Sequence, residues 1–96
     1  MSPPATRPLR LPPDVQHTIR SLHPDLKRRM RSALDTLRTR PERGKALVGE
    51  LTGWYSWRVG TVRIIYRQHR TVVEVAAIGP RATIYFDVAR RVKPRH

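Results

Sequence analysis

The 96-residue sequence contains no cysteine. Disulfide bonds and thiolate metal sites are therefore excluded, and the composition suits a reducing cytoplasm. Long hydrophobic runs are also missing, since no apolar stretch approaches the about 20 residues that a membrane-spanning helix needs. The first residues lack the apolar core of a signal peptide. We therefore expect a cytoplasmic protein that does not associate with a membrane.

Acidic residues are scarce, with 7 Asp and Glu against 20 Lys and Arg, which gives a formal net charge of +13. Such a charge on a small chain favours an anionic partner, with nucleic acid as the first candidate. Most of the basic residues are arginines, whose planar guanidinium group binds phosphate in a bidentate manner. A solvated basic surface or contact with an acidic protein is the alternative interpretation.

The four histidines give no sign of a metal site. None of them has the spacing to a second histidine or to a carboxylate that metal binding would require. We predict neither a metal nor a cofactor.

The length fits one small domain with a modest core that a partner protein would complete. Five of the nine prolines lie within the first 13 residues. Residues 1–8 are therefore predicted to form an extended tail, followed by a single domain over residues 9–96. Leu9 to Leu11 suit a short edge strand.

Two helix starts follow one another, at Pro13-Asp14 and Pro24-Asp25. The residue before Pro41 disfavours helix, so the second helix is expected to end near residues 38–40. The apolar residues recur at helical spacing and predict a helical hairpin with one buried stripe on each helix. These stripes are Val15, Ile19 and Leu22, then Leu26, Met30, Ala33, Leu34 and Leu37. Leu47, Val48 and Leu51 are expected to hold the following segment against the core.

Gly60-Thr61 separates two runs of β-branched and aromatic residues, which predicts a two-residue hairpin with Val59 opposite Val62. Side chains alternate between the faces of a strand. One face is then apolar and belongs to the core; it consists of Tyr55, Trp57, Val59, Val62, Ile64 and Tyr66.

The opposite face of this hairpin is basic. The register places Arg58 opposite Arg63, and Trp54 opposite Arg67. Like charges in directly opposed positions destabilise an antiparallel pair, and a bound anion would relieve their repulsion. We interpret this face as a phosphate-binding surface, on which Trp54 either stacks a base or is covered by other parts of the protein.

A second turn at His69-Arg70 predicts a third strand that ends at Gly79-Pro80. This register places Glu74 beside Ile65 and within reach of the arginines on either side of it. It also continues the apolar face, with Val73 beside Tyr66, Val75 beside Ile64 and Ala77 beside Val62.

The chain after this strand admits two interpretations. Ile84, Val88 and Val92 are spaced four apart and favour a short C-terminal helix with Tyr85 in its first turn. A fourth strand over residues 82–86 is the alternative.

The segment PERGKALVGELTGWYSWRVGTVRIIYRQHRTVVEVAAIGPRATIY resembles the RelE/ParE toxins of bacterial type II toxin–antitoxin modules. The likeness rests on the order of three features: a Pro- and Gly-containing connection after a helical hairpin, the R-V-G-x-x-R-I-I-Y hairpin, and an I-G-x-R turn followed by Tyr85. The resemblance implies an α+β fold, an α/β sandwich. Its N-terminal helical hairpin packs on a small twisted antiparallel sheet, and it ends in a short C-terminal helix. The resemblance also implies a cognate antitoxin protein as partner.

The resemblance implies two different activities. RelE toxins cleave mRNA in the ribosomal decoding site, by attack of a ribose 2′-OH on the adjacent phosphate, whereas ParE toxins poison DNA gyrase. The shared fold does not decide between them, but the high positive charge favours the ribosome. The leading interpretation is a ribosome-dependent mRNA endonuclease. A gyrase inhibitor and an inactive protein that binds nucleic acid and antitoxin are the alternatives.

Three residues match the family's site positions. Arg63 and Arg81 match the family's arginines for phosphate and transition-state binding, and Tyr85 matches its late tyrosine, which we place near the 2′-OH. Pro80 stands where many relatives have histidine, and Arg58 is the only basic residue where RelE has strand lysines. No proton donor is therefore identified.

Five further residues complete the expected RNA-binding surface. Arg58, Arg67 and Trp54 are expected to contact RNA on the sheet. Arg90 and Arg91 are expected to contact RNA phosphates, or else to favour the dipole of a C-terminal helix.

Overall fold

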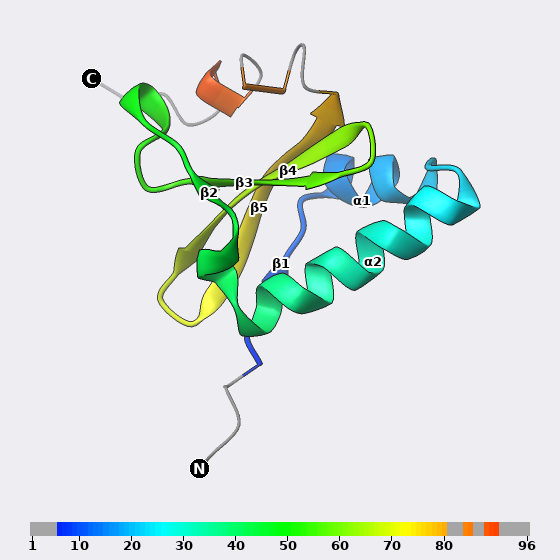
Figure 1. The fold of residues 1–96 in the computed structure, drawn as a ribbon, viewed down its shortest axis with the longest axis horizontal. Coiled ribbons are helices and arrows are strands. Elements are labelled where there is room, and N and C mark those ends of the chain that lie inside the picture. The colour runs from blue at the N-terminus through cyan, green and yellow to red at the C-terminus, as the bar shows by residue number, and fades with distance from the viewer. Residues whose placement is uncertain (1–5, 81–83, 86–87, 91–96) are drawn as a thin grey trace.

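The computed structural model describes residues 6–80, 84–85 and 88–90. Its helices and strands are β1 (Leu9–Arg10), α1 (Pro13–Arg20), α2 (Pro24–Thr39), η1 (Pro41–Arg43), β2 (Lys45–Ala46), η2 (Gly49–Leu51), β3 (Tyr55–Val59), β4 (Val62–His69) and β5 (Val72–Pro80). The five strands form one sheet in the order β1-β5-β4-β3-β2. Figure 1 shows α1 and α2 on one side of this sheet and the helical residues 84–85 and 88–90 on the other.

The helical hairpin forms as predicted. Both helices begin with a proline, which has no N–H group to leave unpaired in the first turn. The second helix ends at Thr39, two residues before Pro41, in agreement with the expected end. In the described part of the chain, no helix is both long enough and apolar enough to cross a membrane.

The main core lies between the two helices and the sheet. Met30 and Leu37 of α2 are fully buried against Ile64, Tyr66 and other residues of the central strands. The predicted apolar face of the β3–β4 hairpin supplies this contact, as the alternation of its side chains indicates.

The β3–β4 register is confirmed at every position from Val59–Val62 to Tyr55–Tyr66. Gly60 has a φ of 58°, a left-handed conformation that glycine adopts without a Cβ clash. The turn therefore has the residue that it requires, and Arg58 lies opposite Arg63 as predicted.

The predicted β4–β5 register is wrong. The turn consists of Arg70 and Thr71, because Arg70 takes the left-handed conformation with a φ of 58° and His69 pairs with Val72. Strand β5 also has a bulge at Ala76. In the observed register, the partners of Tyr66, Ile64 and Val62 are Val75, Ile78 and Pro80 rather than Val73, Val75 and Ala77.

Three further expectations need correction. The sheet is mixed rather than wholly antiparallel, because β1 pairs with β5 in the parallel direction. Val48 does not contact the core, since 84% of it is exposed. The strand alternative at the C-terminal end is also wrong, because residues 84–85 and 88–90 are helical. Val92 lies outside the described residues.

A smaller core covers the opposite face of the sheet. Leu51, Trp54, Ile65, Ala77, Ile84 and Val88 are all buried in this second cluster. The helical residues of the C-terminal segment thus pack on the same face as the arginines of β3 and β4, and this packing brings Tyr85 to them.

Tyr66 holds the segment after α2 against the sheet. Its buried hydroxyl donates a hydrogen bond of 2.6 Å to the carbonyl of Pro41 and accepts one of 2.9 Å from the N–H of Gly44. Burial raises the pKa of this hydroxyl to about 12, because ionisation would place a charge in the core. The connecting segment is therefore fixed at its start by one side chain from β4.

Candidate functional site

Three polar side chains meet on the second face of the sheet. Ser56 of β3 lies with its Oγ 3.1 Å from the hydroxyl of Tyr85 and 3.5 Å from a terminal nitrogen of Arg63. The Arg63 guanidinium also lies 6.0 Å from the centre of the Tyr85 ring, a cation–π distance. The structure therefore brings together Arg63 and Tyr85, the two described members of the expected catalytic set.

A small cleft lies beside this cluster. It has a volume of about 90 Å³ and is lined by Arg58, Arg63 and the turn between them. Arg58 is exposed, and its Nε donates a 3.2 Å hydrogen bond to the carbonyl of Gly60. Two guanidinium groups therefore border one cleft, an arrangement that suits a phosphate group.

Arg67 is used differently from the other two strand arginines. Its guanidinium lies 4.5 Å from the centre of the Trp54 ring and donates a 3.2 Å hydrogen bond to Glu74. Glu74 also lies 3.9 Å from Arg10 of β1. The predicted placement of Glu74 beside Ile65 is wrong, because the shifted β5 register puts this carboxylate opposite Arg67 and not within the Arg63 cluster.

Trp54 lies in the second core. Only 6% of this residue is exposed, with Arg67 over its ring and the apolar cluster around it. Its burial agrees with the alternative that the ring is covered by other parts of the protein. A base cannot stack on it while this packing holds.

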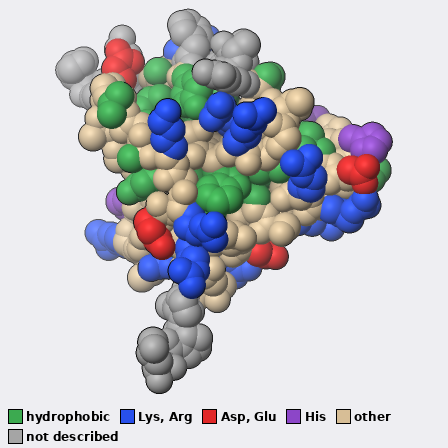
Figure 2. Space-filling view, viewed as in Figure 1, with side chains coloured by type: hydrophobic (Ala, Val, Ile, Leu, Met, Phe, Trp, Pro, Cys, Tyr) green, Lys and Arg blue, Asp and Glu red, His purple; other side chains and the backbone are tan. Residues whose placement is uncertain are grey.

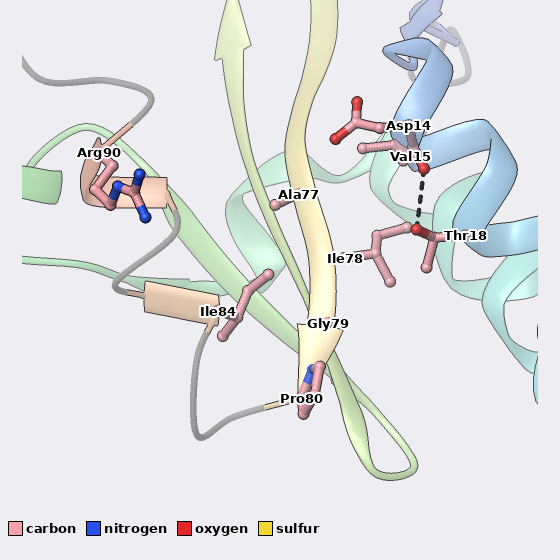
Figure 3. A pocket seen from close by; sticks show the side chains of 9 residues that line it. All are labelled: Asp14, Val15, Thr18, Ala77, Ile78, Gly79, Pro80, Ile84 and Arg90. Carbon is pink, nitrogen blue, oxygen red and sulfur yellow. Dashed lines mark hydrogen bonds between the residues drawn. The ribbon is translucent and has the colours of Figure 1, made fainter.

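The remaining expected site residues lie elsewhere. Arg81 and Arg91 fall outside the described residues. Arg90 is exposed and lines a larger cavity of about 550 Å³, together with Asp14 and Thr18 of α1 and the end of β5 (Figure 3). That cavity does not include Arg63, Ser56 or Tyr85, so the structure places Arg90 outside their cluster.

Basic side chains are abundant on one face of the molecule. In the view of Figure 2, Lys and Arg side chains outnumber Asp and Glu, and hydrophobic side chains lie among them. Among the residues described, no three His, Cys, Asp or Glu side chains converge as metal binding would require. Independently of this, the two guanidinium groups that border the small cleft suit an anionic ligand.

Ser56 is the residue that the sequence prediction missed. It alternates with Tyr55 and Trp57 and so faces the same side as Arg58, but a serine between aromatic residues gives no sign that it would be buried beneath a tyrosine 29 positions later. The available signal was its position in the hairpin, on the same face as Arg58 and Arg63.

Residues 9–85 match the family model described as the ParE toxin of the type II toxin–antitoxin system parDE. Comparison with curated protein sequences gives no match.

Several solved structures share the fold. The RelBE2 toxin–antitoxin complex from Mycobacterium tuberculosis contains a chain that is 28% identical over 81% of this chain and 94% of its own, with a TM-score of 0.69. A mutant of the toxin RelE from E. coli, in the free state, is 17% identical over 94% of this chain and 100% of its own, with a TM-score of 0.76. The RelE–RelB complex from Pyrococcus horikoshii contains a chain that is 23% identical over 80% of this chain and 97% of its own, with a TM-score of 0.64.

Proposed function

This chain belongs to the RelE/ParE family of toxins from type II toxin–antitoxin systems, and we propose that it acts as a ribosome-dependent mRNA endonuclease. The observation that carries the proposal is the cluster of Arg63, Ser56 and Tyr85 beside a cleft with a second arginine. This cluster offers both charge for a phosphate group and a hydroxyl group that can exchange a proton.

The proposed reaction is transfer of a phosphate ester within the RNA chain. The 2′-oxygen attacks the adjacent phosphorus, a new P–O2′ bond forms and the P–O5′ bond breaks. The products are a 2′,3′-cyclic phosphate and a 5′-hydroxyl, and the proton lost by the 2′-OH balances the one gained by the leaving oxygen. A positively charged group beside the non-bridging phosphate oxygens stabilises the transition state of such a reaction.

We assign Arg63 and Arg58 to the phosphate. Both guanidinium groups border the cleft, where their planar donors suit the oxygens of a phosphate group. Because they cannot exchange protons, Tyr85 is the described residue of the cluster that can take part in proton transfer. Arg81 is proposed from its place in the I-G-x-R turn alone.

We also propose a cognate antitoxin as partner. The Mycobacterium and Pyrococcus structures named above are both toxin–antitoxin complexes. The net charge of +13 on 96 residues favours a partner with acidic segments, which would offset charge repulsion within the toxin.

Primer extension on a reporter mRNA in a bacterial translation extract tests the proposed activity. Wild-type protein should cut the message at translated codons and leave ribosome-free message intact. Arg63→Ala should slow cleavage by about 100-fold or more, because a preorganised charge at the transition state is lost.

Arg31→Ala is the matched control for this substitution. It removes the same charge from an exposed position on α2, outside the arginine cluster, so cleavage should stay near the wild-type rate. Intact message in the presence of wild-type protein would refute the proposal.

Gyrase inhibition is the second candidate, because the matching family model carries the ParE description. A supercoiling assay with purified gyrase separates the two activities. Inhibited supercoiling together with intact mRNA would establish the ParE-type function in place of the nuclease.

A further inference from the structure

Ser56 is an unusual residue in its surroundings. Apart from the aromatic residues, it is the only buried residue with a polar side chain in the described part of the chain, with 3% of it exposed. It lies on β3 opposite Ile65, beneath the small apolar core that Ile84 and Val88 complete. A hydroxyl in such a place is costly unless its hydrogen bonds are made.

The direction of these hydrogen bonds follows from the donors. A guanidinium group carries only donors, so Arg63 donates to the Ser56 oxygen at 3.5 Å. Ser56 then has one proton of its own, and the Tyr85 oxygen at 3.1 Å is its partner. If Tyr85 donated instead, the Ser56 proton would have no acceptor among the described residues, which is a costly arrangement for a buried hydroxyl.

The favoured network therefore runs from Arg63 through Ser56 to Tyr85. In this arrangement the Tyr85 oxygen accepts a hydrogen bond, and its own proton points away from Ser56. Successive hydrogen bonds of this kind strengthen one another in a site of low dielectric constant. The half-buried tyrosine thus presents its O–H group as a donor beside the guanidinium group.

We propose that Ser56 is a positioning residue, which fixes the direction of the Tyr85 hydroxyl. Ser56 itself does not touch the RNA. It acts through Tyr85, whose outward O–H group meets the phosphate ester at the reacting bond. The assignment rests on the proposed nuclease function.

A double-mutant cycle separates this role from simple packing. The readout is the single-turnover cleavage rate of ribosome-bound mRNA at saturating toxin. Ser56→Ala should lower that rate about tenfold, which is the effect of one hydrogen bond at a reacting group. Tyr85→Phe should lower it by about 100-fold, within the range for a group that takes part in proton transfer.

The decisive variant combines both substitutions. If Ser56 acts through Tyr85, adding Ser56→Ala to Tyr85→Phe should change the rate by less than about twofold. Independent losses, which multiply in the double variant, would overturn the proposal. Ser32→Ala is the matched control, since it deletes an exposed serine hydroxyl from α2 and should leave the rate unchanged.

Two further variants guard against a folding defect. Ser56→Thr keeps the hydroxyl and should restore at least a third of the wild-type rate. Ser56→Cys has nearly the same size but a weak donor, so it should behave like Ser56→Ala. If Ser56→Ala does not fold, the cycle is run with Ser56→Cys. A rate for Ser56→Cys equal to that of the wild type would overturn the proposal.

The affinity for an uncleavable message distinguishes failure of this inference from failure of the proposed function. Toxin binding is measured on ribosomes programmed with an mRNA that has a 2′-deoxynucleotide at the cleavage position. If wild-type protein binds but does not cut the normal message, the proposed nuclease function is refuted. The Ser56→Ala and Tyr85→Phe cycle is then evaluated from the binding affinities of the four proteins instead of their cleavage rates. Coupling between Ser56 and Tyr85 would then support the positioning role. Additive losses, or no binding by wild-type protein, would refute it.

Discussion

Replacing Tyr66 with phenylalanine removes one hydroxyl group from the interior of the protein. The Tyr66 side chain is fully buried, and its hydroxyl connects β4 to the segment that follows α2. It donates to the carbonyl of Pro41 at 2.6 Å and accepts from the N–H of Gly44 at 2.9 Å. The substitution leaves both backbone groups without this partner.

The expected loss follows from the burial of these two groups. Pro41 is buried, so its carbonyl bears a desolvation cost of about 1–3 kcal/mol when unpaired. Gly44 is partly exposed, and its N–H regains some hydrogen bonding to water. We therefore expect a loss of about 2 kcal/mol. For a domain of this size, that lowers the melting temperature by roughly 10 °C.

Urea unfolding measures this loss, and Tyr55→Phe is its matched control. Tyr55 stacks on Tyr66 with ring centres 5.7 Å apart, but its hydroxyl makes no hydrogen bond to the residues described. Its removal should change the free energy of unfolding by less than about 0.5 kcal/mol. The slope of the denaturant dependence should stay constant in both variants. Equal losses for the two substitutions would refute the reasoning from the Tyr66 hydrogen bonds.

The same group predicts a pH dependence: its folded pKa is raised from 10.0 to about 12, so its contribution is complete below pH 10 and is lost as the pH rises towards 12. Between pH 10 and pH 12 the wild-type free energy of unfolding should fall by about 2 kcal/mol more than that of Tyr66→Phe, and parallel curves would contradict this. Gly44→Ala should destabilise the protein by about 2 kcal/mol or more, because its Cβ would lie 2.2 Å from the Tyr66 oxygen. Gly79→Ala should cost less in the same urea titration, since the nearest atom is the flexible end of Ile84 at 3.3 Å. Glu74→Gln should cost no more than about 1 kcal/mol, because the Arg67 side chain that it pairs with is 37% exposed. A loss of 3 kcal/mol or more in thermal unfolding would instead show that this ion pair behaves as a buried one.

The β3–β4 hairpin could be predicted from the sequence because two independent signals agree. Gly60 permits the left-handed turn conformation, and the alternation of apolar residues permits only one pairing of the strands. The position of the opposed arginines Arg58 and Arg63 follows directly from this register. The pairing of these two arginines was therefore predictable, because both lie on one hairpin.

The third strand could not be predicted in the same way. Arg70 takes a conformation that usually favours glycine, so the sequence did not mark the true turn. The bulge at Ala76 adds one residue to β5, so the side chains beyond it point to the opposite face from the one predicted. Ala77, which was expected beside Val62, lies in the second core instead. The misplaced turn alone explains why Glu74 was predicted beside Ile65, whereas it pairs with Arg67.

The candidate site also depends on contacts between segments far apart in the chain. Tyr85 does not lie on the sheet but on the helical residues that follow β5. The apolar side chains of Ile84 and Val88 dock these residues onto the second face, and this packing sets the position of the tyrosine hydroxyl. Local patterns predicted the arginines, since these are fixed by strand pairing. Tyr85, which completes the cluster, is instead positioned by the packing of its apolar neighbours, and this packing places its hydroxyl next to the buried Ser56. The chemistry of the cluster is therefore tied to the stability of the small second core, and a change in that core alters the site without touching any of its polar groups.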